Sequence, residues 1–262
     1  MRDAADFSEN TLIHAVADLL LAIDHDLFID KLIYILRMAI SFDDYVVLVY
    51  HPVEKPVVLG SSLASDELVA WERYLEGAYL LSPFYDFCMQ GGEGLVSLDE
   101  IAPDDFYQSA YHDEYFRFSG LVDEVCFVIQ SDHDLCYLIS LGRTQTLSKF
   151  NHRVLNKCRA YYPLIRSAVL MHDRQNAPVS RGSHEPIKTA LLNFGEGSLT
   201  PREKEVMQLL IRGHSSKESA RKLDMSYETE RVHRKNIYVK LGVNSQKELL
   251  GKLFDQILNP NH

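Results

Sequence analysis

The sequence of 262 residues predicts an α+β protein with two domains. In its N-terminal part, helix-period and strand-period patterns alternate around a strong hairpin signal, which predicts an α/β sandwich around an antiparallel sheet. Its C-terminal part shows four short helix-period patterns with capping residues, which predicts an all-α domain of four helices. We place the first domain at 1–173, a linker rich in turn-forming residues at 174–198, and the second domain at 199–262.

The charge of the chain changes sign between these two domains. Residues 199–262 contain 12 Lys and Arg against 8 Asp and Glu, a net charge of +4, whereas the preceding residues carry a net charge of −14. The overall charge of −10 therefore conceals a basic domain joined to an acidic one. Because an acidic surface repels nucleic acid, any contact with nucleic acid should be confined to the second domain.

The first domain begins with two helices and a strand pair. Helical spacing over 10–41 is interrupted near Asp24-His25-Asp26, which predicts two helices with a break between them. The apolar run YVVLVY at 45–50 predicts a strand, and residues 56–60 predict a second strand that pairs with it. Further helical patterns occupy residues 65–77, 82–90 and 103–118.

A second hairpin and a long helix complete the first domain. Residues 123–130 and 135–141 form two strand patterns on either side of the turn-forming segment Ser131-Asp132-His133-Asp134. Residues 147–173 predict one long helix that contains Pro163, a residue that can kink it. Helices, hairpin, helices, hairpin and helix is the order expected of an α/β sandwich.

The second domain can be divided into helices by its capping residues. Thr200-Pro201-Arg202-Glu203 is the pattern of a capping box with proline at the first helical position. Ser215 to Glu218 and Ser245 to Glu248 repeat the capping box, and Ser226 is a simple N-cap. Gly213 and Gly242 stand where helices should end. The four predicted helices are 201–212, 216–223, 227–241 and 246–258.

The second and third of these helices are separated by Asp224-Met225-Ser226, a turn of helix-turn-helix length. Apolar residues at helical spacing predict a small shared core. They are Val206, Leu209, Leu210, Ala220, Leu223, Ile237 and Leu241. The opposite face of the third helix is basic, with Arg231, Arg234, Lys235 and Lys240. A cationic helix that can enter the major groove supplies phosphate attraction and side chains that reach base edges, so we expect this domain to bind DNA.

The strings LTPREKEV, SSKESARKL and TERVHRKNIYVKLGV resemble the C-terminal DNA-binding domain of the LuxR/NarL family over roughly sixty residues, about a quarter of the chain. The resemblance implies that Arg231, Val232 and Lys235 read bases. It also implies that the last helix contributes to dimerisation. Phosphate contacts are implied for Lys217, Thr229 and Asn236. One departure is Glu230, because the family usually has an apolar residue at this position.

The first domain resembles the GAF/PAS-like sensory domains of ligand-responsive LuxR-type regulators in the order of its elements and in the hairpin DEVCFVIQ–LCYLISLGR. The stretch from Trp71 to Asp86 is also similar to acyl-homoserine-lactone receptors, which have a Trp, a Tyr and an Asp-Pro pair in a similar order. In those receptors the aspartate accepts a hydrogen bond from the ligand amide. This chain has Ser82 before Pro83, which argues against a standard lactone receptor.

The density of aromatic residues in this region favours a small-molecule pocket, because such pockets are mostly apolar with a few polar groups. The residues expected to bind the ligand are Trp71, Tyr74, Tyr79, Phe84, Tyr85 and Asp86. If Asp86 or Asp123 lines the pocket, a cationic ligand such as an amine is favoured. The alternative interpretation of the aromatic residues is that they are ordinary core and surface residues.

These observations predict a transcription regulator that is controlled by a small-molecule effector and binds double-stranded DNA as a homodimer on an inverted-repeat operator. RNA polymerase is a further candidate partner. Two alternatives stay open: a ligand-independent regulator whose first domain mediates only dimerisation or protein contacts, and an acyl-homoserine-lactone receptor with a variant pocket. A phosphoacceptor response regulator is disfavoured, because receiver domains open with a strand and this chain opens with helices.

Other classes of protein find no support in the sequence. No GxSxG, HExxH, GxGxxG or P-loop string occurs, so we expect no enzymatic activity and no cofactor. The four cysteines, Cys88, Cys126, Cys136 and Cys158, are widely spaced and form no metal or redox motif. The polar N-terminus lacks the pattern of a secretion signal, and the apolar run 15–23 is too short to span a membrane. We therefore expect a cytoplasmic, nucleoid-associated protein.

Overall fold

The computed structural model describes residues 9–52, 54–62, 68–131, 135–176 and 192–258. The chain divides into two compact units. The first unit consists of Met1–Leu68, Phe87–Ile101 and Gly120–Gly182, and the second of Val69–Asp86, Ala102–Ser119 and Ser183–His262. The predicted domain boundaries stay a prediction, and the centre of the predicted linker, 177–191, lies outside the described residues.

The first unit is built on a five-stranded antiparallel sheet in the order β2-β1-β5-β4-β3. Its strands are β1 (Asp44–Tyr50), β2 (Val57–Ser61), β3 (Gly94–Ser97), β4 (Asp123–Gln130) and β5 (Cys136–Arg143). The long central hairpin pairs Asp123 with Arg143 at one end and Gln130 with Cys136 at the other. The predicted antiparallel sheet and both predicted hairpins are confirmed.

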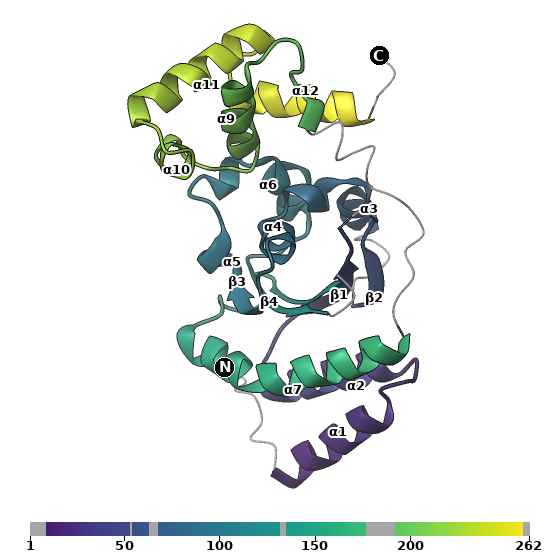
Figure 1. Cartoon of the computed structure of the whole chain (residues 1–262). Coiled ribbons are helices and arrows are strands. Elements are labelled where there is room, and N and C mark those ends of the chain that lie inside the picture. Colours follow the sequence, from purple (N-terminus) through teal and green to yellow (C-terminus); the bar gives the residue numbers. More distant parts are fainter. Residues whose placement is uncertain (1–8, 53, 63–67, 132–134, 177–191, 259–262) are drawn as a thin grey trace. The chain divides into compact units, whose positions relative to one another are not determined.

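Two helices, α2 (Phe28–Ala39) and α7 (His152–Asn176), cover one face of this sheet, and α1 (Glu9–Leu21) packs against α2. Figure 1 shows α2 and α7 running side by side below the strands, with α1 beneath them. Alternate strand residues point into the core between these layers, because successive side chains of a strand face opposite sides. Val125, Phe127 and Ile129 of β4 belong to this core.

The other face of the sheet carries the remaining strand positions. On β4 and β5 these are Glu124, Cys126 and Val128 opposite Gly142, Ser140 and Leu138. Cys126, Val128 and Leu138 are almost fully buried. At one end of this face the amide of Gln130 donates hydrogen bonds to the backbone oxygens of Cys88 and Gly92, at 2.8 and 2.9 Å.

The second unit contains the short helices of the aromatic region. They are α3 (Leu68–Glu76), η2 (Ala78–Leu81), the first residues of α4 (Pro83–Met89), η3 (Phe106–Gln108), α6 (Ala110–Glu114) and η4 (Phe116–Phe118). The predicted single helix over 103–118 is wrong, because the structure has three short helices there. Ser109 interrupts the segment as the N-cap of α6, where it accepts a hydrogen bond from the amide of His112.

Two elements of the first unit were not predicted. Strand β3 is only four residues long, and α5 (Leu98–Ile101) follows it directly.

The long helix α7 begins at His152 instead of residue 147, because the side chain of Asn151 accepts a hydrogen bond from the amide of Val154 at 3.0 Å. The helix continues through Pro163.

The C-terminal four helices are those predicted: α9 (Pro201–Ile211), α10 (Ser216–Lys222), α11 (Tyr227–Leu241) and α12 (Gln246–Leu258). Their shared core is almost fully buried at Val206, Leu210, Ala220, Ile237 and Leu241, as expected. Leu209 and Leu223 were also expected in this core but are only half-buried. With the sheet in the first unit, this helical domain confirms the predicted α+β class.

Candidate nucleic-acid interface

Local capping fixes where the helices of this domain begin. The capping box at Thr200 is complete: the Glu203 amide donates to Thr200 Oγ1 at 3.3 Å, and the Thr200 amide donates to Glu203 Oε2 at 2.8 Å. Ser226 caps α11 by accepting a hydrogen bond from the amide of Thr229 at 3.0 Å. Gly242 ends α11 in the left-handed conformation, with φ of 66°.

The two other predicted capping boxes form only in part. Ser215 and Ser245 accept the expected hydrogen bonds from the amides of Glu218 and Glu248, both at 3.1 Å. The two glutamate carboxylates do not return to the capping residue. Glu248 accepts from the amide of Asn244 at 2.8 Å, and Glu218 lies 2.7 Å from the Nδ1 atom of His214. These caps still define the start of α10 and α12.

The turn between α10 and α11 sets the direction of the recognition helix. Leu223 ends α10, Asp224 adopts a left-handed φ of 49°, and Met225 leads into the N-cap Ser226. The amide of Met225 donates to the backbone oxygen of Ala220 at 3.0 Å, which closes the turn. The predicted three-residue turn is therefore confirmed.

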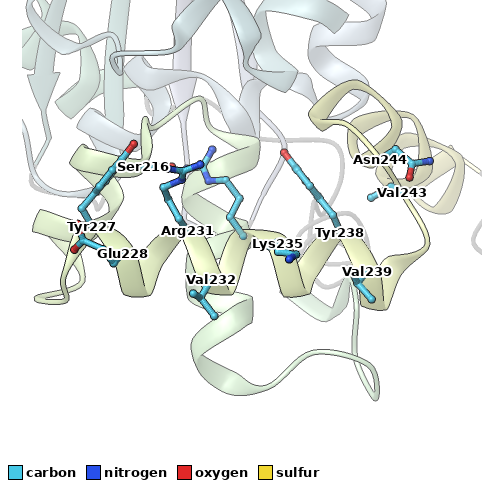
Figure 2. Close-up of a pocket in the computed structure, with 11 residues that line it drawn as sticks. Ser216, Tyr227, Glu228, Arg231, Val232, Lys235, Tyr238, Val239, Val243 and Asn244 are labelled. Carbon is cyan, nitrogen blue, oxygen red and sulfur yellow. The ribbon is translucent and has the colours of Figure 1, made fainter.

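A groove of about 690 Å³ runs along α11. Its lining residues are Ser216, Tyr227, Glu228, Arg231, Val232, Arg234, Lys235, Tyr238, Val239, Val243 and Asn244. Figure 2 shows the side chains that α11 contributes spread along the helix, from Tyr227 near its start to Val239 near its end. Arg231 and Lys235 are exposed, and Val232 is 58% exposed. The three residues expected to read bases therefore lie on one accessible helical surface.

Arg231 is partly held in place by an aromatic ring. Its guanidinium carbon lies 5.7 Å from the centre of the Tyr227 ring, one turn earlier on α11. A cation–π contact of this kind orients the guanidinium without consuming its hydrogen-bond donors. Arg231 can therefore still offer its planar set of donors to a guanine edge or a phosphate.

Arg234 has a different environment from the other cations of α11. Its Nε and Nη2 atoms donate to Glu230 Oε1 at 3.0 and 2.7 Å, and Nη2 also donates to the backbone oxygen of His214 at 3.1 Å. The side chain of Glu230 is fully buried, and that of Arg234 is only 15% exposed. The pair holds α11 against the loop between α9 and α10, and DNA could engage Arg234 only by sharing or breaking it.

Lys240 is also paired within the domain. Its Nζ atom donates to Glu203 Oε2 at 2.7 Å, the same carboxylate that closes the first capping box. Burial opposes ionisation of Glu203, but its hydrogen bonds with Lys240 and Thr200 outweigh that effect and lower its pKa. The end of α11 is thus joined to the start of α9 by a charge-assisted bond.

The residues expected to meet phosphates are exposed. Lys217 lies in the first turn of α10, and Thr229 and Asn236 lie on α11. Thr229 Oγ1 is 2.9 Å from the hydroxyl oxygen of its capping residue Ser226. Phosphate contacts by these three residues stay a prediction.

The aromatic residues expected to bind a ligand are brought together in the second unit. Trp71 stacks on Tyr74 with 4.9 Å between ring centres, Tyr74 lies 4.8 Å from Tyr115, and the ring of Tyr79 meets Tyr85 edge-on at 5.4 Å. These rings and Phe84 are buried. Clustering of the predicted residues is therefore observed, and their role in ligand binding stays a prediction.

The two aspartates considered as partners of a cationic ligand are already engaged. Asp86 accepts a hydrogen bond from Arg212 Nε at 2.9 Å. Asp123 accepts from the backbone amides of Phe150 and Glu124, at 2.7 and 2.9 Å. A third acidic residue, Glu124, was not among the residues predicted from the sequence. It is buried on the face of the sheet turned away from α2 and α7. Strand alternation, which places it beside Cys126, was the available signal.

The described residues include no group of three or more His, Cys, Asp or Glu side chains placed to hold a metal ion. No helix in the described part of the chain is long and apolar enough to cross a membrane. The four cysteines are buried free thiols.

The capped helices, the turn and the accessible basic helix define a DNA-binding transcription regulator of the helix-turn-helix class. Residues 197–252 match the family described as "GerE: Bacterial regulatory proteins, luxR family". The C-terminal domain is therefore a LuxR-type helix-turn-helix domain, as its resemblance to this family predicted.

Two related proteins match this chain over different lengths. The chain is 24% identical over 157 residues to a putative HTH-type transcriptional regulator of Aeromonas salmonicida, which covers 56% of this chain and 80% of that protein. It is 44% identical over 69 residues to the transcriptional regulatory protein UhpA of Escherichia coli, covering 26% of this chain and only 35% of UhpA.

The solved VqsR LBD domain from Pseudomonas aeruginosa has a similar fold, with a TM-score of 0.56 and 23% identity. The match covers 63% of this chain and 98% of that domain.

Proposed function

We propose that this protein is a homodimeric transcription regulator that binds an inverted-repeat operator through α11 and responds to a small molecule bound by its N-terminal domain. The DNA-binding part rests on one observation: Arg231, Val232 and Lys235 lie together on an accessible surface of a helix whose start, end and tilt are fixed by internal bonds. A helix of this kind fits the major groove, where arginine and lysine read guanine and an apolar side chain meets a thymine methyl group.

Two recognition helices of a symmetric dimer would contact half-sites about one helical turn apart, ~34–36 Å along the duplex. The acidic N-terminal part, with its net charge of −14 over residues 1–198, disfavours a second DNA contact there. Effector binding is supported by the cluster of buried aromatic rings and by the likeness in fold to the VqsR LBD domain.

The test of DNA binding is fluorescence anisotropy of the full chain with duplexes selected from a random pool. The double variant Arg231→Ala/Lys235→Ala should lose most of its affinity for the selected duplex. Lys157→Ala, which removes an exposed cation from α7 in the other unit, should bind as the wild type does. Equal affinity of the double variant and the Lys157 control would contradict the proposal.

The test of effector binding is native mass spectrometry of protein purified from its cells. A reproducible mass excess that disappears on denaturation would identify a bound small molecule. Absence of any such molecule, together with no thermal stabilisation by a metabolite library, would favour the ligand-independent alternative, because a ligand at 100 times its dissociation constant stabilises a fold by ~2.7 kcal/mol.

A further inference from the structure

Glu124 is a buried carboxyl group whose hydrogen-bonding needs are only half met. Its Oε1 atom accepts a hydrogen bond from the Ser140 hydroxyl at 2.5 Å and a weaker one from the Cys126 thiol at 3.8 Å. Its Oε2 atom is buried and has no hydrogen-bond partner among the described residues. A buried acceptor left without a donor destabilises the fold, and more so when it is charged.

The charges around Glu124 make this arrangement less favourable still. Burial, together with the negative charge of Asp123, raises the pKa of Glu124 to about 7, although the hydrogen bonds with Ser140 and Cys126 act in the opposite direction. No Lys or Arg in the described part of the chain donates to either oxygen of Glu124. Asp123 itself is satisfied by backbone amides, so it has no need of another donor. The position lacks a cation.

Apart from Ser140 and Asp123, the side chains around Glu124 are apolar or thiol groups. Cys126 lies two residues along the same strand and is fully buried, and it pairs with Val96 of β3 on one side and Ser140 of β5 on the other. Opposite Glu124 is Gly142, which places no side chain beside the carboxyl group and is overlain by Leu121. Besides the Ser140 hydroxyl, the neighbours that these contacts give to Glu124 are the Cys126 thiol and the aliphatic side chain of Leu121.

We infer that Glu124 is the polar anchor of an effector site on this face of the sheet, and that the effector is an apolar molecule carrying a protonated amine. The ammonium group would donate to Oε2 and supply the missing positive charge, while Ser140 and Cys126 hold Oε1 in place. Charge-assisted hydrogen bonds of this kind are about twice as strong as neutral ones. The inference rests on the proposed effector function and names its ligand class.

The experiment compares three probes with one skeleton: 2-phenylethylamine, 2-phenylethanol and phenylacetate. Isothermal titration of the full-length protein should show that the amine binds roughly tenfold or more tightly than the alcohol, with no binding of the anion. Glu124→Gln, which keeps the size of the side chain and removes its charge, should abolish the preference for the amine. The matched control is Asp99→Asn, which removes an exposed carboxylate on α5 in the same unit and should keep the preference.

Three results would overturn the inference: equal binding of amine and alcohol by the wild type, an undiminished preference in Glu124→Gln, or no binding of any probe. Glu124→Met serves as a second variant that lacks the charge, so the result does not depend on the folding of one mutant. A co-purified molecule without an amine, seen by native mass spectrometry, would refute the role of Glu124 and leave the proposed effector function standing. The affinity of Glu124→Gln for DNA, measured without any probe, tests the DNA-binding function separately from the effector site.

Discussion

The buried ion pair on α11 leads to an unequal effect of two alanine substitutions. Glu230 is fully buried, and its Oε2 atom has no hydrogen-bond partner among the described residues. In Arg234→Ala, both donors to Oε1 are lost and an unpaired charge stays buried, so the domain should lose about 3–5 kcal/mol in the free energy of unfolding. In Glu230→Ala, Arg234 keeps its bond to the His214 backbone oxygen and can extend to solvent, so the loss should be smaller, about 1–3 kcal/mol.

Replacing both partners by apolar residues separates the pair from its packing. The double variant Glu230→Val/Arg234→Leu restores the apolar residue usual for the family at position 230 and leaves no buried charge. Exchanges of this kind are often neutral or stabilising by about 1–4 kcal/mol. The double variant should therefore be at least as stable as the wild type.

The assay is urea unfolding of the full-length protein, with hydrogen exchange of the amides of α9 and α11 as the probe. These amides report on the helical domain separately from the sheet. Circular dichroism of the whole chain is the control for global folding. A loss in Arg234→Ala no greater than that in Glu230→Ala would refute the reasoning. So would a double variant as unstable as Arg234→Ala.

Three further outcomes follow from the structure. Arg231→Ala should weaken DNA binding by ~1–3 kcal/mol and relax sequence preference, whereas Lys217→Ala should weaken binding to all duplexes equally and reduce the slope of log affinity against log salt concentration by about 1. Anisotropy titrations over operator variants and salt concentrations measure both effects, and an equal loss of affinity for every duplex in Arg231→Ala would refute base reading. Because the pKa of Glu124 is raised from 4.5 to about 7 in the folded state, the folded protein binds this proton more tightly than the unfolded chain. The free energy of unfolding should therefore fall by up to about 3 kcal/mol as pH rises from 4.5 to about 7. Denaturant titrations at several pH values measure this fall, and Glu124→Gln should remove it. Tyr137→Phe should cost about 1–3 kcal/mol in thermal unfolding, because the tyrosine hydroxyl donates to the carboxylate of Asp173 at 2.6 Å; an unchanged melting temperature would show that this bond contributes nothing.

The helices of the DNA-binding domain could be predicted because their signals are local. A cap residue and the amide that it binds are three residues apart, so Thr200, Ser215, Ser226 and Ser245 mark helix starts without knowledge of the fold. The central hairpin was predictable for the same reason, since two apolar runs flank a short polar turn. Strand β3 was not, because four residues carry too little periodicity and its pairing with β4 is fixed by the rest of the sheet.

The electrostatic roles of the basic residues could be predicted only in part. The sequence places Arg231, Arg234, Lys235 and Lys240 on one helix, and nothing in their spacing shows which of them is free. The partner of Lys240 is Glu203, 37 residues earlier, so the pair depends on tertiary packing. The partner of Arg234 lies one turn away on the same helix, and the i,i+4 spacing from Glu230 was a signal that could have been read.

Methylation interference shows directly whether the protein reads DNA in the major groove. Duplexes selected from a random pool are methylated with dimethyl sulfate, which modifies guanine N7 in the major groove and adenine N3 in the minor groove, and those that the full-length protein still binds are sequenced. Methylated guanines should interfere in two clusters about 10 base pairs apart, and this interference should weaken in Arg231→Ala. Selection of no preferred sequence, or interference from adenine N3 alone, would contradict a recognition role for α11.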